Sequence, residues 1–166
     1  SGSDINHTAD GFTYLFQQLS GDGEEQVQIN YLAHSPHWNL AGVMIREALD
    51  PSSPNAFVGF NGGSGNPQSI FQQRNYYGDF TSGTYGSHMS FPMWVKLERI
   101  GHDFYAYESS DGSNWSSLGS AYIHMEVDVY IGLAVASPSP GVSSIFNPAN
   151  LIINGQIFRK PSPNVN

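Results

Sequence analysis

The stretch QVQINY, residues 26–31, alternates polar and apolar side chains at every position. In an extended chain its valine, isoleucine and tyrosine point to one side, and its glutamines and asparagine point to the other. A period of two residues is typical of an antiparallel strand with one buried and one solvated face. The stretch VKLE, residues 95–98, repeats the pattern with charged side chains on the polar side. Both stretches predict antiparallel sheet over a hydrophobic core.

Other parts of the chain have the composition of short strands, and turn signals separate them. Clear turns are DPSSP at residues 50–54 and NGGSGNP at residues 61–67. We expect strands over residues 12–17, 25–32, 41–48, 56–60, 69–74, 93–99, 103–109, 128–136 and 151–158. Short strands at this spacing predict an all-β fold, a two-sheet antiparallel β-sandwich or jelly roll. Residues 75–92 are expected to form a long loop that is either functional or disordered.

The length and composition fit one globular domain. A chain of 166 residues can bury roughly 70% of its unfolded surface in a single core. We expect one β-sandwich domain over residues 1–158 and a tail or the start of a linker over residues 159–166. The abrupt start SGSD indicates processing or an excised piece. We therefore expect a piece of a larger protein.

The charge of the chain restricts its partners. The formal net charge is −8, and the six lysines and arginines are scattered rather than gathered in a basic stripe. Nucleic acid binding needs such a stripe, so we do not expect it. No apolar run approaches the roughly 20 residues that span a bilayer. Cysteine is absent, which excludes disulfides and thiol nucleophiles. A neutral polymer is the partner that fits best.

Four stretches together resemble a known family. The stretches are TADGF with LSGDG (8–12 and 19–23), WNLAGVMIRE (38–47), WVKLERIG with YAYESSDGSNW (94–101 and 105–115), and YIGLAV (130–135). Their order and spacing are similar to those of the DUF1349-like, concanavalin A-like and laminin-G-like jelly-roll domains of bacterial extracellular proteins.

The resemblance is specific for fold and weak for function. Such modules are often attached to secreted polysaccharide-degrading enzymes and cell-surface proteins, but the superfamily includes lectins, binding modules, glycosidases and lyases. It implies an extracellular or cell-surface location. It also implies one or two additional strands before Asp4, which this chain does not carry. The chain is then either a fragment or has a sheet edge that another segment can fill.

The segment NYYGDF, residues 75–80, has the composition of a sugar-binding site. Sugars offer C–H faces to aromatic rings and hydroxyl groups to planar polar side chains, and this segment supplies both kinds of group. The alternative is a loop whose aromatic rings fold back onto the edge of the sandwich. The candidate ligand-binding residues are Trp38, Asn39, Arg46, Arg74, Asn75, Tyr76, Tyr77 and Tyr85.

Arg46 and Arg74 lie on predicted strands, and the resemblance implies that such positions line a concave face. There an arginine could donate two hydrogen bonds to vicinal hydroxyl groups or to a uronate. The alternative is an ion pair with Glu47, Glu98 or an exposed carboxylate. Trp94 and Trp115 are expected to be structural, as is the DGSNW turn.

Candidates for catalysis and metal binding are weaker. Glu126 and Asp128 would share one face of a strand, as in the Glu-x-Asp pair of laminarinase-like glycosidases, but the third carboxylate of that signature is absent. A structural Ca²⁺ ion could be held by Asp4, Asp10 and Asp22, although no ligand spacing supports it. No other cofactor is expected.

These observations favour a noncatalytic carbohydrate-binding module of a secreted bacterial protein, with a polysaccharide or oligosaccharide as ligand. A first alternative is a structural or adhesive subunit of an extracellular assembly that pairs through an open strand edge. A second alternative is a glycoside hydrolase or polysaccharide lyase.

Overall fold

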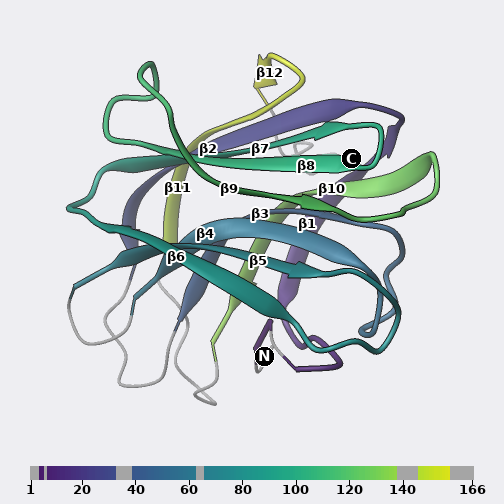
Figure 1. Ribbon diagram of the computed structural model, residues 1–166. Coiled ribbons are helices and arrows are strands. Elements are labelled where there is room, and N and C mark those ends of the chain that lie inside the picture. The colour runs from purple at the N-terminus through teal and green to yellow at the C-terminus, as the bar shows by residue number, and fades with distance from the viewer. Residues whose placement is uncertain (1–3, 6, 33–38, 63–65, 138–145, 158–166) are drawn as a thin grey trace, which may run out of the picture.

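The computed structural model describes residues 4–5, 7–32, 39–62, 66–137 and 146–157. These residues form two six-stranded antiparallel sheets that stack face to face (Figure 1). The first sheet has the order β1 (Thr13–Ser20), β10 (Asp128–Ala136), β3 (Leu40–Arg46), β4 (Asn55–Asn61), β5 (Gln68–Arg74), β6 (Ser82–His88). The second has the order β12 (Gln156–Ile157), β11 (Phe146–Ile153), β2 (Gly23–Leu32), β7 (Met93–Ile100), β8 (Asp103–Ser109), β9 (Ser116–Tyr122). No helix that could cross a membrane occurs among the described residues.

The predicted all-β sandwich is confirmed, and the two-residue period explains how it forms. In β2 the side chains of Val27 and Ile29 are fully buried, and Val27 lies opposite Val95 of β7. The inward-facing residues of both sheets form one apolar cluster between them. Alternation along the strands thus places apolar side chains in the core and leaves glutamine, lysine and glutamate on the outer face of the second sheet.

The prediction of a continuous loop over residues 75–92 is wrong, because it contains β6. The strand at Ser116–Tyr122 was also missed. Both are edge strands, β6 of the first sheet and β9 of the second, and most of their residues are exposed. Edge strands without a buried face lack the apolar alternation on which sequence-based assignment depends. The predicted tail, residues 159–166, lies outside the described residues.

The outer face of the first sheet carries a second apolar cluster. Met44 and Phe57 belong to it, whereas their neighbours Val43 and Val58 face the core between the sheets. The N-terminal segment covers this face, since Ile5 is fully buried in the same cluster. The segment is closed by two main-chain hydrogen bonds between Asp4 and Gly11. The central strands β3 and β4 are therefore buried on both faces.

The turn between β8 and β9 shows why the DGSNW motif is structural. The carboxylate of Asp111 accepts hydrogen bonds from the main chain of Ser113 and Asn114, and these bonds hold its pKa well below the usual range. Gly112 has φ +73°, and a Cβ atom there would lie 2.7 Å from the ring of Trp94. The turn can therefore pack directly on the ring of Trp94 because residue 112 has no side chain.

We expect Gly112→Ala to lower the free energy of unfolding by about 2–4 kcal/mol, from left-handed strain and overpacking against the ring of Trp94. Chemical denaturation of the purified variant measures the loss. Gly101→Ala is the matched control, because Gly101 has φ +62° but no atom near the added Cβ. Equal losses in the two variants would show that the tryptophan contact contributes nothing.

Candidate functional site

Three buried arginines lie at one end of the sandwich. Arg46 ends β3, Arg74 ends β5, and Arg99 is the next to last residue of β7. Their exposed fractions are 1%, 0% and 3%. Because β3 and β5 both pair with β4 in antiparallel register, Arg46 and Arg74 flank Asn55 in one row across the sheet. Burying a guanidinium group is costly unless its donors find partners, so the acceptors around each arginine define the local structure.

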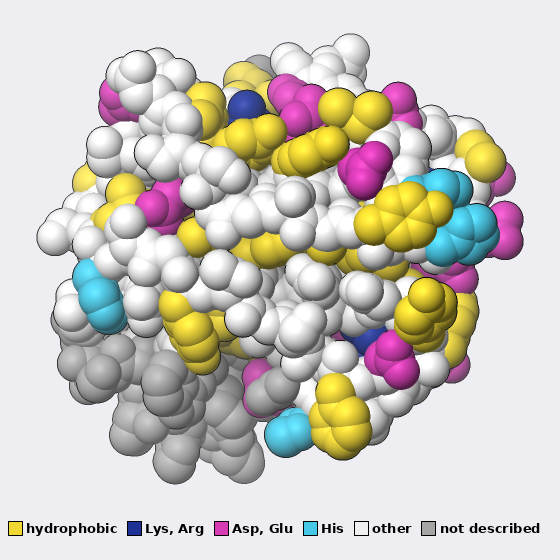
Figure 2. All heavy atoms as spheres, in the orientation of Figure 1, with side chains coloured by type: hydrophobic (Ala, Val, Ile, Leu, Met, Phe, Trp, Pro, Cys, Tyr) yellow, Lys and Arg dark blue, Asp and Glu magenta, His cyan; other side chains and the backbone are white. Residues whose placement is uncertain are grey.

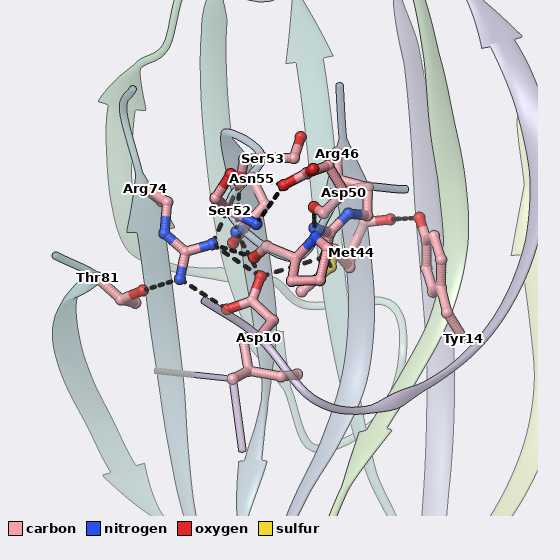
Figure 3. A network of polar contacts seen from close by, with 12 residues as sticks. Asp10, Tyr14, Met44, Arg46, Asp50, Ser52, Ser53, Asn55, Arg74 and Thr81 are labelled. Atoms are coloured by element: carbon pink, nitrogen blue, oxygen red, sulfur yellow. Dashed lines mark hydrogen bonds and ion pairs between the residues drawn. The ribbon is translucent and has the colours of Figure 1, made fainter. Parts of the chain in front are cut away.

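The carboxylate of Asp10 lies between Arg46 and Arg74 (Figure 3). It accepts hydrogen bonds from Arg46 Nη1 at 3.2 Å and from Arg74 Nη1 and Nη2 at 2.9 and 2.7 Å. Asn55 Nδ2 donates to it at 3.2 Å. Burial lowers the pKa of Arg46, and the charge of Asp10 acts against this effect. Two cations thus share one buried anion, and their remaining N–H groups need other acceptors.

Main-chain carbonyl groups of the β3–β4 connection, residues 47–54, supply several of these acceptors. For Arg46 they are Ala48 at 2.6 Å and Asp50 at 2.5 Å, and for Arg74 they are Pro51 at 3.0 Å and Ser53 at 3.3 Å. The two guanidinium groups therefore fix the main chain of this connection through its carbonyl groups.

Arg74 also holds the connection between β5 and β6, residues 75–81, which we call the aromatic loop. Its Nε donates to the carbonyl oxygen of Asp79 at 3.0 Å, and its Nη2 donates to Thr81 Oγ1 at 3.0 Å. A main-chain hydrogen bond of 3.0 Å joins the loop to the β3–β4 connection. A loop fixed in this way presents its outward side chains with little conformational freedom to lose on binding.

Those outward side chains are aromatic. Tyr76, Tyr77 and Phe80 are 68%, 52% and 76% exposed. Figure 2 shows large hydrophobic side chains exposed toward the right-hand end of the molecule. An aromatic ring that is this exposed gains little from folding, so its apolar face remains available to a ligand.

The carboxylate of Glu47 links the aromatic loop to the β9–β10 connection. Burial raises the pKa of Tyr77, and the hydrogen bond between its side chain and Glu47 adds to this effect. Oε2 of Glu47 also accepts the main-chain N–H of Glu126 at 3.0 Å. Glu126 precedes β10, so Glu47 ties together connections from three places in the chain.

Arg99, on β7 of the second sheet, fixes three further connections at the same end of the sandwich. Within the described part of the chain, its guanidinium donates to five main-chain carbonyl groups, those of Gly21, Gly101, Met125, Glu126 and Val127, at 2.7–3.4 Å. The β1–β2 turn, the β7–β8 turn and the β9–β10 connection are thereby held by one side chain. Together with the aromatic loop and the β3–β4 connection they form what we call the loop end.

The structure does not expose the predicted arginines. Arg46 and Arg74 donate to Asp10 and to loop carbonyl groups, so a surface ligand meets the loops and not the guanidinium groups. The expected ion-pair partners, Glu47 and Glu98, are wrong for both residues. Asp10 is 36 and 64 positions away in sequence, and nothing local indicates the pairing.

The remaining predicted ligand residues do not form one group. Tyr76 and Tyr77 lie on the aromatic loop, where Asn75 is partly buried. Asn39 is fully buried next to the start of β3, at the opposite end of that strand from the loop end. Tyr85 is exposed on β6, in register with Ile70, away from the loop. Trp38 lies outside the described residues.

The three predicted Ca²⁺ ligands are not brought together. Asp10 is engaged with two arginines, and Asp22 accepts the main-chain N–H of Gly101 at 2.7 Å. Strand β1 separates Asp4 and Asp10 from Asp22, a distance of roughly 25 Å along an extended chain. Within the part of the chain that the structure describes, no group of three or more His, Cys, Asp or Glu side chains could hold a metal ion.

Comparisons with known proteins agree with this architecture. No protein-family model and no curated protein matches the chain. Among solved structures it is similar to a functionally unknown protein from Saccharomyces cerevisiae, with TM-score 0.71, 12% identity, and coverage of 91% of this chain and 82% of that one. It is also similar to a mutant of the GH43 protein BlXynB from Bacillus licheniformis (TM-score 0.64, 9% identity, 81% and 31% coverage).

A xylan β-1,4-xylosidase from Bacillus halodurans is a further neighbour, with TM-score 0.63, 13% identity, and coverage of 87% of this chain and 29% of that one. Identities this low show the fold alone, a β-sandwich consistent with the concanavalin A-like fold. The chain spans less than a third of the length of the two bacterial proteins.

Proposed function

We propose that the protein is a noncatalytic carbohydrate-binding module of a secreted protein, and that it binds a glycan at the loop end. The observation that carries this proposal is the aromatic loop. Tyr76, Tyr77 and Phe80 are exposed on a segment whose main chain is fixed from beneath by Arg74. Rigid aromatic side chains provide apolar faces for the C–H surfaces of sugar rings, and hydroxyl groups nearby provide hydrogen bonds.

The solved neighbours support a carbohydrate context. Two of them are named as a GH43 protein and a xylan β-1,4-xylosidase, and this chain corresponds to under a third of each. A sandwich of this size could therefore serve in a larger sugar-active protein without carrying the reaction itself. A secreted location fits that role.

A noncatalytic role is proposed because the one carboxylate pair suggested by the sequence is not arranged as a pair. Asp128 opens β10, but Glu126 lies before the strand, and its main chain is engaged by Glu47 and Arg99. The two side chains therefore do not share a strand face, as a Glu-x-Asp pair would require.

The proposal predicts that Tyr76→Ala and Phe80→Ala each weaken glycan binding by about tenfold or more, because each removes an exposed stacking face at the centre of the site. A glycan array identifies ligands of the wild-type domain, and calorimetry on the best ligand measures the variants. Tyr31→Ala is the matched control, since Tyr31 is a similarly exposed tyrosine on β2, outside the loop end. Unchanged affinity in both loop variants would place the site elsewhere, and absence of any glycan ligand would refute the function.

A second candidate function rests on a separate observation, the free edge of β1. Among the described strands β1 pairs only with β10, and its eight residues TYLFQQLS carry no charge. Leu15 and Phe16 are partly exposed there. Natural edge strands are usually protected by charges, so an uncharged edge is a template for another strand. Light scattering over a concentration series tests assembly through this edge, and Phe16→Lys is expected to abolish any assembly that it supports.

A further inference from the structure

Two histidines meet at the loop end. His102 lies in the turn between β7 and β8, and His124 lies two residues beyond β9. Their ring centres are 4.4 Å apart with an interplanar angle of 36°. Figure 2 shows histidine side chains gathered at the right-hand edge of the molecule. The two segments are the β7–β8 turn and the β9–β10 connection, so the contact depends on the tertiary fold.

The main chain holds this pair in place. Ile123 donates its N–H to the carbonyl oxygen of His102 at 2.9 Å, which fixes the two segments against each other. Arg99 donates to carbonyl groups on both sides, at Gly101 and at Met125. The two imidazoles are therefore presented without a large entropic cost of bringing them together.

One imidazole nitrogen is left unsatisfied. Nδ1 of His102 is buried and has no hydrogen-bond partner among the described residues. Buried polar atoms are nearly always paired, and an exception calls for an explanation such as an ion. A cation bound between the rings would provide one, since neutral imidazole nitrogen is a common metal ligand.

The surroundings favour a cation. The carboxylate of Asp22 accepts a hydrogen bond from the main-chain N–H of Gly101, the residue before His102. Asp103 is the residue after His102. The nearby cation, Arg99, is buried and donates to carbonyl groups. The net charge of the chain, −8, adds a general attraction for positive ions.

The ring separation indicates which metal fits. A metal–nitrogen bond of about 2.0–2.1 Å places each imidazole centre about 3.2 Å from the metal. Centres 4.4 Å apart then subtend an angle of about 90° at the metal. Tetrahedral Zn²⁺ would separate the centres by about 5.2 Å. An angle near 90° is that of neighbouring positions in tetragonal Cu²⁺ coordination, and Cu²⁺ also binds nitrogen ligands most strongly among the divalent metals of its row.

We propose that His102 and His124 form a two-histidine binding site for Cu²⁺ at the loop end. The described residues contain no cluster of three metal-ligating side chains, so water would occupy the other coordination positions. The inference is independent of glycan binding. A metal held by both residues would cross-link the β7–β8 turn to the β9–β10 connection and would stabilise the folded state by mass action.

The test is titration of the purified, metal-free protein with Cu²⁺ in a non-chelating buffer, followed by calorimetry, electron paramagnetic resonance and thermal unfolding. We expect one Cu²⁺ per chain, hyperfine structure from two nitrogen ligands, and an increase in Tm. His102→Asn and His124→Asn are each expected to weaken Cu²⁺ binding by about tenfold or more and to remove the increase in Tm.

His88→Asn is the matched control, because His88 is an exposed histidine on β6, away from the loop end, and its ring contacts the carbonyl oxygen of Asn66. His124 is exposed, so its variant should fold even if the His102 variant does not. Binding that is unchanged in His124→Asn would overturn the site. A larger increase in Tm with Zn²⁺ than with Cu²⁺, lost in the same variants, would overturn the assignment to copper.

Discussion

Replacing Asp10 with alanine is expected to lower the free energy of unfolding by about 3–5 kcal/mol, because the variant leaves two buried guanidinium groups without their shared anion. Both arginines are essentially unexposed, so water cannot replace the lost carboxylate without local opening. For a chain of this size the loss corresponds to a decrease in Tm of about 6–20 °C. Chemical and thermal denaturation measure it.

Asp79→Ala is the matched control, since Asp79 lies at the same end but is exposed, and Arg74 contacts only its main chain. That variant should stay within about 0.5 kcal/mol of wild type. Amide hydrogen exchange adds a local measurement: in Asp10→Ala, protection should fall in residues 75–81 and 47–54 before it falls in the sheets. A loss below about 1 kcal/mol for Asp10→Ala would contradict the burial of the two arginines, because it would show that water solvates them.

The second large effect concerns Glu25 and has the opposite sign. Its side chain is fully buried between the sheets, in a row with Leu97 and Ile153, and neither carboxyl oxygen has a hydrogen-bond partner among the described residues. Glu25→Leu is expected to raise the free energy of unfolding by about 1–3 kcal/mol, because it replaces an unsatisfied polar group with an apolar one of similar size. The increase in Tm should be about 2–12 °C.

The effect of Glu25 should depend on pH. Burial raises the pKa of Glu25 well above its ordinary value of 4.5, and only the nearby main chain of Met44 acts against the effect. The folded state therefore keeps the proton that the unfolded state releases as pH rises above that ordinary value. The free energy of unfolding of the wild type therefore decreases as the pH rises from 4.5 to the raised pKa of the folded state. Glu25→Leu removes this loss, so the difference between variant and wild type should grow with pH.

Glu24→Leu provides the control, because Glu24 is the preceding residue on the same strand and lies on the solvated face, opposite Glu98. Because Glu24 is not part of the core, Glu24→Leu should not reproduce the increase in stability of Glu25→Leu. A Glu25 variant whose advantage is constant with pH would show that the carboxyl group is ionised in the folded protein.

The sequence was sufficient for the sandwich because β2 and β7, the central strands of the second sheet, alternate between buried and less buried residues. Val27 and Ile29 of β2 and Val95 of β7 were placed correctly by their two-residue period alone. The edge strands β6 and β9 were not predicted, since most of their residues are exposed and have no apolar period to detect. The filling of the outer face of the first sheet by Ile5 was also beyond prediction, because it depends on a segment that forms no strand.

The candidate site was predictable in composition and not in arrangement. The segment NYYGDF does present exposed aromatic rings, as its content of tyrosine and phenylalanine indicates. The roles of Arg46 and Arg74 required knowing that Asp10 returns to them from a distant part of the chain. A signal was nevertheless present: the strands predicted over residues 69–74 and 93–99 both end in arginine, and the strand predicted over residues 41–48 has Arg46 near its end. Arginine at that position fits a role in binding the carbonyl groups of the loop that follows.

The anchoring of the loops by strand arginines has a consequence for protein engineering. Arg46, Arg74 and Arg99 bind mainly carbonyl oxygens, which every amino acid supplies, so the main chain of the loops is held independently of their own side chains. Positions such as 76, 77 and 80 could therefore be randomised in a display library with little risk to folding. The chain would then serve as a cysteine-free scaffold whose recognition surface is exchangeable, in the manner of antibody hypervariable loops.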